Sequence, residues 1–200
     1  MGILDYIFPK RCINCKKQGD YLCPNCFTFL SFDTKNICLV CKKQSLTNFT
    51  HKYCRKKYKI DGCFSGIRNN YIAKKLISSF KNKPYLTDLQ SFLIDLLYES
   101  LIQSESFMKL IKKTNFVLVP VPLSGEMLRK RGYNQAEILS KGLGKKLNIK
   151  ILNLEKVNIE TKNVFIVDDL INTGKTLENL AFVLKKKGVK QVFGLILAGK

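Results

Sequence analysis

The segment VFIVDDLINTGKT, residues 164–176, carries the clearest structural signal in this chain. Its first four residues are apolar, as in a strand that is buried on both faces of a parallel sheet. Two adjacent carboxylates, Asp168 and Asp169, follow at once, and a short loop then ends in Thr-Gly-Lys-Thr. A buried strand that runs directly into two acids predicts a binding site at the end of that strand.

Apolar and amphipathic segments alternate on both sides of this strand. Further strands are predicted at 63–68, 116–123 and 192–198, and helices at 71–81, 86–113 (with a break near Ser104), 133–147 and 175–187. This alternation predicts an α/β fold in which a parallel sheet carries helices on both faces. In that architecture ligands bind beyond the carboxyl ends of the strands, where the two acids are expected to lie.

The loop after the acids has the composition of a phosphate site, but it is not a nucleotide P-loop. That motif needs a glycine at the position of Asp169. The backbone N–H groups of the loop can instead turn inward at the N-terminus of the next helix and hold a phosphate. Thr173 and Thr176 can add hydroxyl donors, while the two carboxylates face hydroxyl groups. Such a site suits a ribose 5-phosphate.

A metal-binding pattern occupies the N-terminal part of the chain. The ligands fall in pairs two residues apart: Cys12 and Cys15, Cys23 and Cys26, Cys38 and Cys41, His51 and Cys54. A two-residue gap lets one tight turn aim both side chains at one ion, and two such turns complete a tetrahedron. The pattern predicts one or two Zn²⁺ ions, with sequential and cross-braced pairing both open. A disulfide framework is the alternative, which reducing conditions disfavour.

These features divide the chain into a zinc-finger module at 1–60 and an α/β domain at 61–200. Cys63, the one cysteine outside the pairs, is expected to be a buried apolar residue of the domain. No apolar run is long enough to span a membrane, and the first residues do not resemble a secretory signal. A cytoplasmic protein is therefore expected.

The net charge of +20 predicts contact with a polyanion, although a general lysine bias would give the same count. Basic and aromatic residues are interleaved at 52–59, as in sites for single-stranded nucleic acid, where charges hold phosphates and rings stack on bases. A solvated edge of the zinc module is the alternative interpretation. The candidate residues are Lys52, Tyr53, Arg55, Lys56, Lys57, Tyr58 and Lys59.

VFIVDDLINTGKT resembles the phosphoribosyl-pyrophosphate (PRPP) signature of type I phosphoribosyltransferases. LVPVPL at 118–123 and LRKRGYNQAEILSKGL at 128–143, behind a cysteine-rich module that opens with LDYIFPKRCINC at 4–15, are similar to the ComF late-competence family. The resemblance covers nearly the whole chain. It implies a role in DNA uptake during natural transformation, with single-stranded DNA and a DNA helicase or another competence protein as partners.

The resemblance also implies roles for individual residues. Asp168 and Asp169 would contact the ribose hydroxyls of PRPP, and Val121 and Pro122 would lie by the pyrophosphate, where related enzymes often strain a peptide bond. The 5-phosphate would be held by Asn172, Thr173, Gly174, Lys175 and Thr176. A mobile loop at 129–135 would close over the diphosphate with the catalytic cations Arg129, Lys130 and Arg131, assisted by Mg²⁺. An exposed basic turn or a DNA-contacting surface is the alternative for these cations.

The chain departs from the family between the RGYNQ-like helix and the VDD-like strand. Family members carry a longer segment there, which helps to cover the site, whereas this interval is only Ile149 to Asn163. Two hypotheses follow. One is a Mg²⁺-dependent phosphoribosyltransferase with an unknown acceptor. The other is a non-catalytic, zinc-dependent adaptor that binds single-stranded DNA or a helicase and uses the PRPP fold as a scaffold or sensor.

Overall fold

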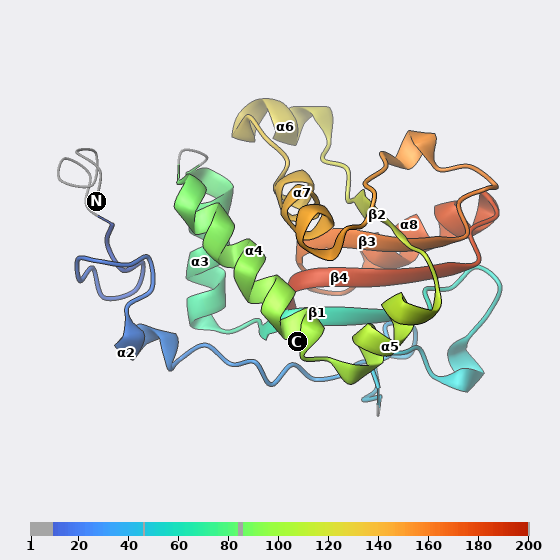
Figure 1. The fold of residues 1–200 in the computed structure, drawn as a ribbon, viewed down its shortest axis with the longest axis horizontal. Helices are drawn as coiled ribbons and strands as arrows, with labels where there is room; N and C mark the ends of the chain where they lie inside the picture. The colour runs from blue at the N-terminus through green and yellow to red at the C-terminus, as the bar shows by residue number, and fades with distance from the viewer. Residues whose placement is uncertain (1–9, 46, 84–85, 200) are drawn as a thin grey trace.

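The core of the protein is a four-stranded parallel sheet (Figure 1). The computed structural model describes residues 10–45, 47–83 and 86–199, so residues 4–9 of the family-like opening lie outside the described part. The strands have the spatial order β1-β4-β3-β2, with bounds Gly62–Arg68 (β1), Val117–Pro120 (β2), Asn163–Leu170 (β3) and Gln191–Gly199 (β4). The predicted α/β class is therefore confirmed.

The predicted central strand is β3, which pairs with β2 on one side and β4 on the other. Val167 aligns with Pro120 of β2 and with Leu195 of β4. The four apolar residues 164–167 are fully buried, as expected for a strand covered on both faces. β2 ends at Pro120, three residues earlier than predicted. Proline has no N–H for the ladder and tends to stand where a strand stops.

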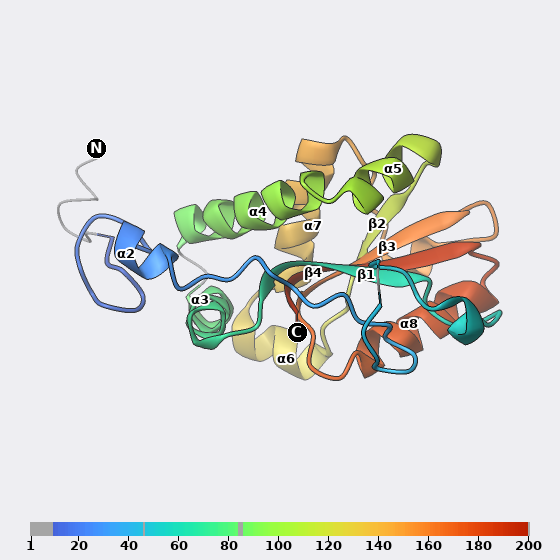
Figure 2. The same cartoon turned by 90° about the horizontal axis from the view of Figure 1, so that it is seen from below.

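Helices cover both faces of the sheet (Figure 2). One face carries α4, α5 and α7, and the other carries α8. The break predicted near Ser104 is confirmed, because Ser104 is the N-cap of α5 and its Oγ accepts a hydrogen bond from the N–H of Phe107. The bounds of the helices are Tyr71–Asn82 (α3), Thr87–Ile102 (α4), Glu105–Lys113 (α5), Gly125–Arg131 (α6), Gln135–Leu147 (α7) and Lys175–Lys186 (α8).

The predicted mobile loop at 129–135 is a helix in its first half, so the loop assignment was wrong there. Arg129, Lys130 and Arg131 form the last turn of α6, where the partial negative charge of a helix C-terminus favours cations. Gly132 ends the helix with a φ of +78° and donates its N–H to Leu128 O at 2.7 Å. A left-handed residue at this position is the usual way to end a helix.

The zinc module contains two short elements, α2 (Pro24–Phe27) and the 3₁₀ turn η1 (Lys52–Cys54). Cys12 and Leu22 belong to the same apolar cluster as α3 and α4, whereas Leu39 belongs to the cluster on the α8 face. Residues of the zinc module thus belong to the apolar clusters on both faces of the sheet. Among the described residues, no helix is long and apolar enough to cross a membrane.

Close packing of α7 on α4 depends on Gly142, where an added Cβ would lie 2.4 Å from Cδ1 of Ile94. Alanine would gain about 1 kcal/mol of helix propensity, but overpacking costs about 1–3 kcal/mol. We expect Gly142→Ala to lower the free energy of unfolding by up to about 2 kcal/mol in urea denaturation.

Gly125→Ala in α6 is the matched control, because a Cβ added at Gly125 would lie 3.9 Å from its nearest neighbour, the Arg129 guanidinium. This substitution should leave stability unchanged or slightly higher. Equal stability of the Gly142→Ala and native proteins would show that α4 and α7 do not constrain each other at this contact.

Candidate functional site

The two acids lie at the carboxyl end of β3, as predicted, but their surroundings differ. Oδ1 of Asp168 accepts a hydrogen bond from the N–H of Asp169 at 2.9 Å. Asp169 is only 5% exposed, and its Oδ1 lies 2.9 Å from Nζ of Lys81 in the last turn of α3. One carboxylate of the doublet is therefore ion-paired with a distant helix.

Ionisation of the Asp168 carboxyl is unfavourable. Burial, with the neighbouring charge of Asp169 as the second cause, raises the pKa of Asp168 from 3.8 to about 7. The hydrogen bond from the Asp169 N–H and the charge of Lys81 act in the opposite direction but are smaller. An acid held in this way binds a cation or a hydroxyl donor readily, because either partner relieves the cost of its charge.

The 172–176 loop opens directly onto the N-terminus of α8. Ile171 anchors the start of the loop by donating its N–H to Ala198 O at 3.1 Å, and Asn172 and Thr173 are exposed. Gly174 is the N-cap of α8, with a φ of +77° and without a side-chain cap. The first turn of a helix leaves N–H groups without intrahelical acceptors, so this end can receive an anion.

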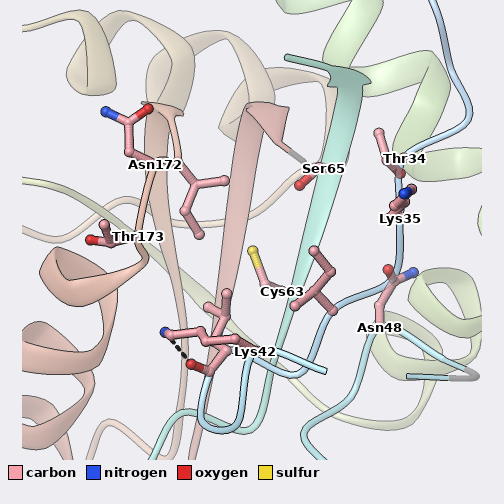
Figure 3. A pocket seen from close by; sticks show the side chains of 11 residues that line it. Thr34, Lys35, Lys42, Asn48, Cys63, Ser65, Asn172 and Thr173 are labelled. Atoms are coloured by element: carbon pink, nitrogen blue, oxygen red, sulfur yellow. Dashed lines mark hydrogen bonds between the residues drawn. The ribbon is translucent and has the colours of Figure 1, made fainter. Parts of the chain in front are cut away.

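The segment of the zinc module around Cys38 and Cys41 lies against this loop and the start of α8. A Cβ added at Gly174 would lie 3.2 Å from Cδ2 of Leu39, and Nζ of Lys42 lies 2.5 Å from Oε1 of Glu178 in the first turn of α8. Lys42 also donates to Leu39 O, as the dashed line in Figure 3 shows. A cavity of about 40 Å³ remains between this segment, β1 and the loop, a space fit for a few water molecules rather than for a nucleobase.

Cys63 lines that cavity from β1 (Figure 3). It is 8% exposed, which confirms the predicted buried position. Burial raises the pKa of its thiol to about 12, so the side chain is neutral.

The turn after β2 is tied to the RGYNQ segment. Nδ2 of Asn134 donates to Val121 O at 3.0 Å, and the N–H of Val121 donates to Val167 O at 2.9 Å. These bonds place the predicted pyrophosphate turn, Val121 and Pro122, beside the end of β3. The described residues contain no cis peptide bond, so the turn is not strained in that way.

The predicted catalytic cations divide into two groups. Arg129 and Lys130 are exposed at the end of α6, whereas Arg131 is half-buried and donates to Oε1 of Gln135 at 3.1 Å. Only Arg131 is therefore fixed by a side-chain contact near the start of α7.

The sequence predicted no individual role for three residues that lie near the acids. Lys81 is one lysine among many, and only the fold brings it to Asp169. Tyr133 and Gln135 lay within the RGYNQ motif but received no individual role. Among the described residues, Oη of Tyr133 and Nε2 of Gln135 are buried without a hydrogen-bond partner, and burial raises the pKa of Tyr133.

The short interval from Ile149 to Asn163 runs along the edge of the sheet. Leu118 donates its N–H to Lys150 O, and Leu152 donates its N–H to Leu118 O. At the far end, Nδ2 of Asn163 donates to Asn115 O, next to the start of β2. The interval therefore lies at the outer edge and amino end of the sheet, away from the acids.

The eight predicted zinc ligands form two clusters, in sequential pairing: Cys12, Cys15, Cys23 and Cys26, then Cys38, Cys41, His51 and Cys54. Within each cluster the ligand atoms lie within 4.8 Å of one another. A tetrahedral Zn²⁺ with Zn–S bonds of about 2.3 Å holds its sulfurs about 3.8 Å apart. Sγ of Cys15 and Sγ of Cys23 are 3.6 Å apart, so the residues fit this ion.

The contact of Nε2 orients the His51 ring so that Nδ1 can bind zinc. Its Nε2 lies 2.9 Å from Gln44 O and its Nδ1 lies 3.2 Å from Sγ of Cys41. A proton on Nε2 satisfies the carbonyl and leaves Nδ1 as the metal-binding atom, the usual arrangement for a ligating histidine. The protein therefore has two zinc-binding sites, one with four thiolates and one with three thiolates and an imidazole.

The predicted nucleic-acid segment, 52–59, is only partly free. The ring of Tyr58 packs against Phe182 with centroids 5.5 Å apart, and Nε of Arg55 donates to Thr50 O at 3.1 Å. In contrast, Tyr53 is 95% exposed. Three lysines of the same segment are also exposed: Lys52, Lys56 and Lys57.

The raised pKa of Asp168 makes stability depend on pH. Because the fold favours the protonated carboxyl, the stability that Asp168 contributes is present below about pH 4 and is lost as the pH rises through about 7. We expect Asp168→Asn to raise the Tm on the order of 5 °C at pH 8, and by less at pH 5.

The exposed acid Asp33 provides the control, since Asp33→Asn should change the Tm little at either pH. Differential scanning fluorimetry over pH 5–8 gives the comparison. A gain that is the same at both pH values would mean that burial does not oppose the ionisation of Asp168.

Comparison with protein families supports both halves of this description. Residues 3–57 match the double zinc ribbon domain, and residues 104–199 match the phosphoribosyl transferase domain. The chain is 27% identical to competence protein ComFC of Bacillus subtilis (strain 168), over 86% of this chain and 81% of that protein. It is 32% identical to competence protein F of Haemophilus influenzae, over 40% of this chain and 50% of that protein. The chain thus joins a double zinc ribbon to a phosphoribosyltransferase domain and is similar in sequence to two competence proteins.

Proposed function

We propose that this protein binds PRPP together with Mg²⁺ and transfers its phosphoribosyl group to an acceptor, as a component of DNA uptake. The observation that carries the proposal is the open 172–176 loop at the N-terminus of α8, next to two acids at the end of a buried strand. The competence names of its relatives support the assignment to DNA uptake. The zinc-finger module at 1–60 and the transferase domain at 61–200 are the two proposed units.

The reaction requires position and charge more than a protein nucleophile. The bond between C1 of the ribose and a pyrophosphate oxygen breaks, pyrophosphate leaves with the electron pair, and the acceptor atom forms the new bond to C1. Backbone N–H groups of the 172–176 loop hold the 5-phosphate, and Asp168 and Asp169 accept hydrogen bonds from the ribose hydroxyls. When bound with the diphosphate, Mg²⁺ would neutralise part of the charge of this leaving group.

The leaving group lies by the turn at Val121 and Pro122 in this proposal. The cations Arg129, Lys130 and Arg131 at the end of α6 face the charge that develops on pyrophosphate. Rotation of α6 about Gly132 would bring Arg129 and Lys130 over the diphosphate, since the glycine has no side chain to restrict its dihedral angles.

The binding step is tested by titrating PRPP with Mg²⁺ in isothermal calorimetry. The native protein should bind, and the double variant Asp168→Asn/Asp169→Asn should lose affinity by about 100-fold or more, because each asparagine lacks the charge and one of the two acceptor oxygens of the carboxylate. The Asp33→Asn variant should bind like the native protein.

Equal affinity of the native and doubly substituted proteins would exclude the acids from the site. Release of pyrophosphate in the presence of candidate acceptor bases then tests transfer, separately from binding.

A second candidate function is that of a non-catalytic adaptor that binds single-stranded DNA or a helicase. The observation that favours it is the exposed ring of Tyr53, in a segment that also exposes Lys52, Lys56 and Lys57. An exposed ring in a basic surface is what stacking on an unpaired base requires.

Fluorescence anisotropy with single-stranded DNA tests this function. Affinity should fall about tenfold or more between roughly 50 and 200 mM salt. Tyr53→Ala and the pair Lys56→Glu/Lys57→Glu should weaken binding. The pair Lys112→Glu/Lys113→Glu at the end of α5, with the same change of net charge, should have a smaller effect. Equal losses for both pairs would assign binding to net charge rather than to this surface.

A further inference from the structure

A buried ion pair connects the acid doublet with a helix that belongs to neither matched domain. Lys81 lies between the matched segments 3–57 and 104–199, in the last turn of α3. Its Nζ is 2.9 Å from Oδ1 of Asp169, and the two side chains are 23% and 7% exposed. Lys81 is thus the cation that the fold places on the second acid of the doublet.

Net stability is a poor explanation for this pair. Removing an ammonium and a carboxylate from water costs about as much as their attraction returns, so a buried pair is often no more stabilising than an apolar contact. The pair does fix another property of Asp169, because it holds the direction of the carboxylate oxygens.

The surroundings of the pair contain unused hydrogen-bonding groups. Phe80, next to Lys81, packs against Tyr133 with ring centroids 6.3 Å apart. Oη of Tyr133 and Nε2 of Gln135, both buried, have no hydrogen-bond partner among the described residues. The end of β3, the end of α3 and the start of α7 therefore meet around Asp169, with polar atoms that a ligand could satisfy.

We propose that Lys81 is a positioning residue for PRPP, acting through Asp169. The inference rests on the proposed function. Asp169 accepts hydrogen bonds from the ribose hydroxyls, and Lys81 holds that acceptor in position. Helix α3, which begins just after β1 at the carboxyl end of the sheet (Figure 1), thereby forms a wall of the site. The short interval Ile149 to Asn163 lies elsewhere and does not supply such a wall.

The test is the affinity for PRPP with Mg²⁺, measured by calorimetry on the full-length protein. Lys81→Met should weaken binding by about tenfold or more, because it leaves a buried carboxylate without its cation. Lys81→Arg should restore most of the affinity, since it restores the charge. Lys74→Met, on the exposed side of the same helix, should have no effect.

A double-substitution cycle separates positioning from other roles. If Lys81 acts through Asp169, the variant Lys81→Met/Asp169→Asn should bind no more weakly than Asp169→Asn alone. Additive losses would overturn the proposal and indicate a contact of Lys81 with the ligand itself. Native-like affinity of Lys81→Met, or no rescue by Lys81→Arg, would also overturn it. Failure of the native protein to bind PRPP would instead refute the proposed function, and the role of Lys81 with it.

Discussion

The burial of β3 between two hydrogen-bonded neighbours is the constraint on which the rest of the structure depends. Because β2 and β4 pair with it on both sides, residues 164–167 cannot leave the core, and the acids that follow must emerge at the carboxyl edge. The same geometry directs the chain into the 172–176 loop and then into α8. The position of the proposed site is thus set by strand packing.

The zinc module is part of this arrangement rather than an appendage. Leu39, next to Cys38, packs in the same core as Ile171 and Leu177, and Lys42, next to Cys41, pairs with Glu178 in the first turn of α8. A small metal-binding module has little core of its own, so metal binding provides most of its folding energy. The geometry of the second zinc site is therefore linked through a few contacts to the loop at the N-terminus of α8.

The charges near the site oppose one another in a way typical of binding sites. Burial and the charge of Asp169 disfavour the ionisation of Asp168, while Lys81 forms its ion pair with Asp169. The net charge of +20 is distributed differently, with exposed cations at the end of α6 and around Tyr53. One group of cations lies near the acids, and the other lies on the zinc module, so the enzymatic and nucleic-acid hypotheses concern different surfaces.

The sequence by itself determined the features that are local in the chain. The α/β class, the position of β3, the identity of the eight zinc ligands and the break at Ser104 all follow from spacing, periodicity and capping within short windows. The pairing of Lys81 with Asp169 and the contact of Leu39 with the 172–176 loop were decided only by the tertiary structure. These contacts join residues far apart in the chain, and no local pattern distinguishes Lys81 from the other lysines until the fold brings a buried carboxylate within 2.9 Å of its Nζ.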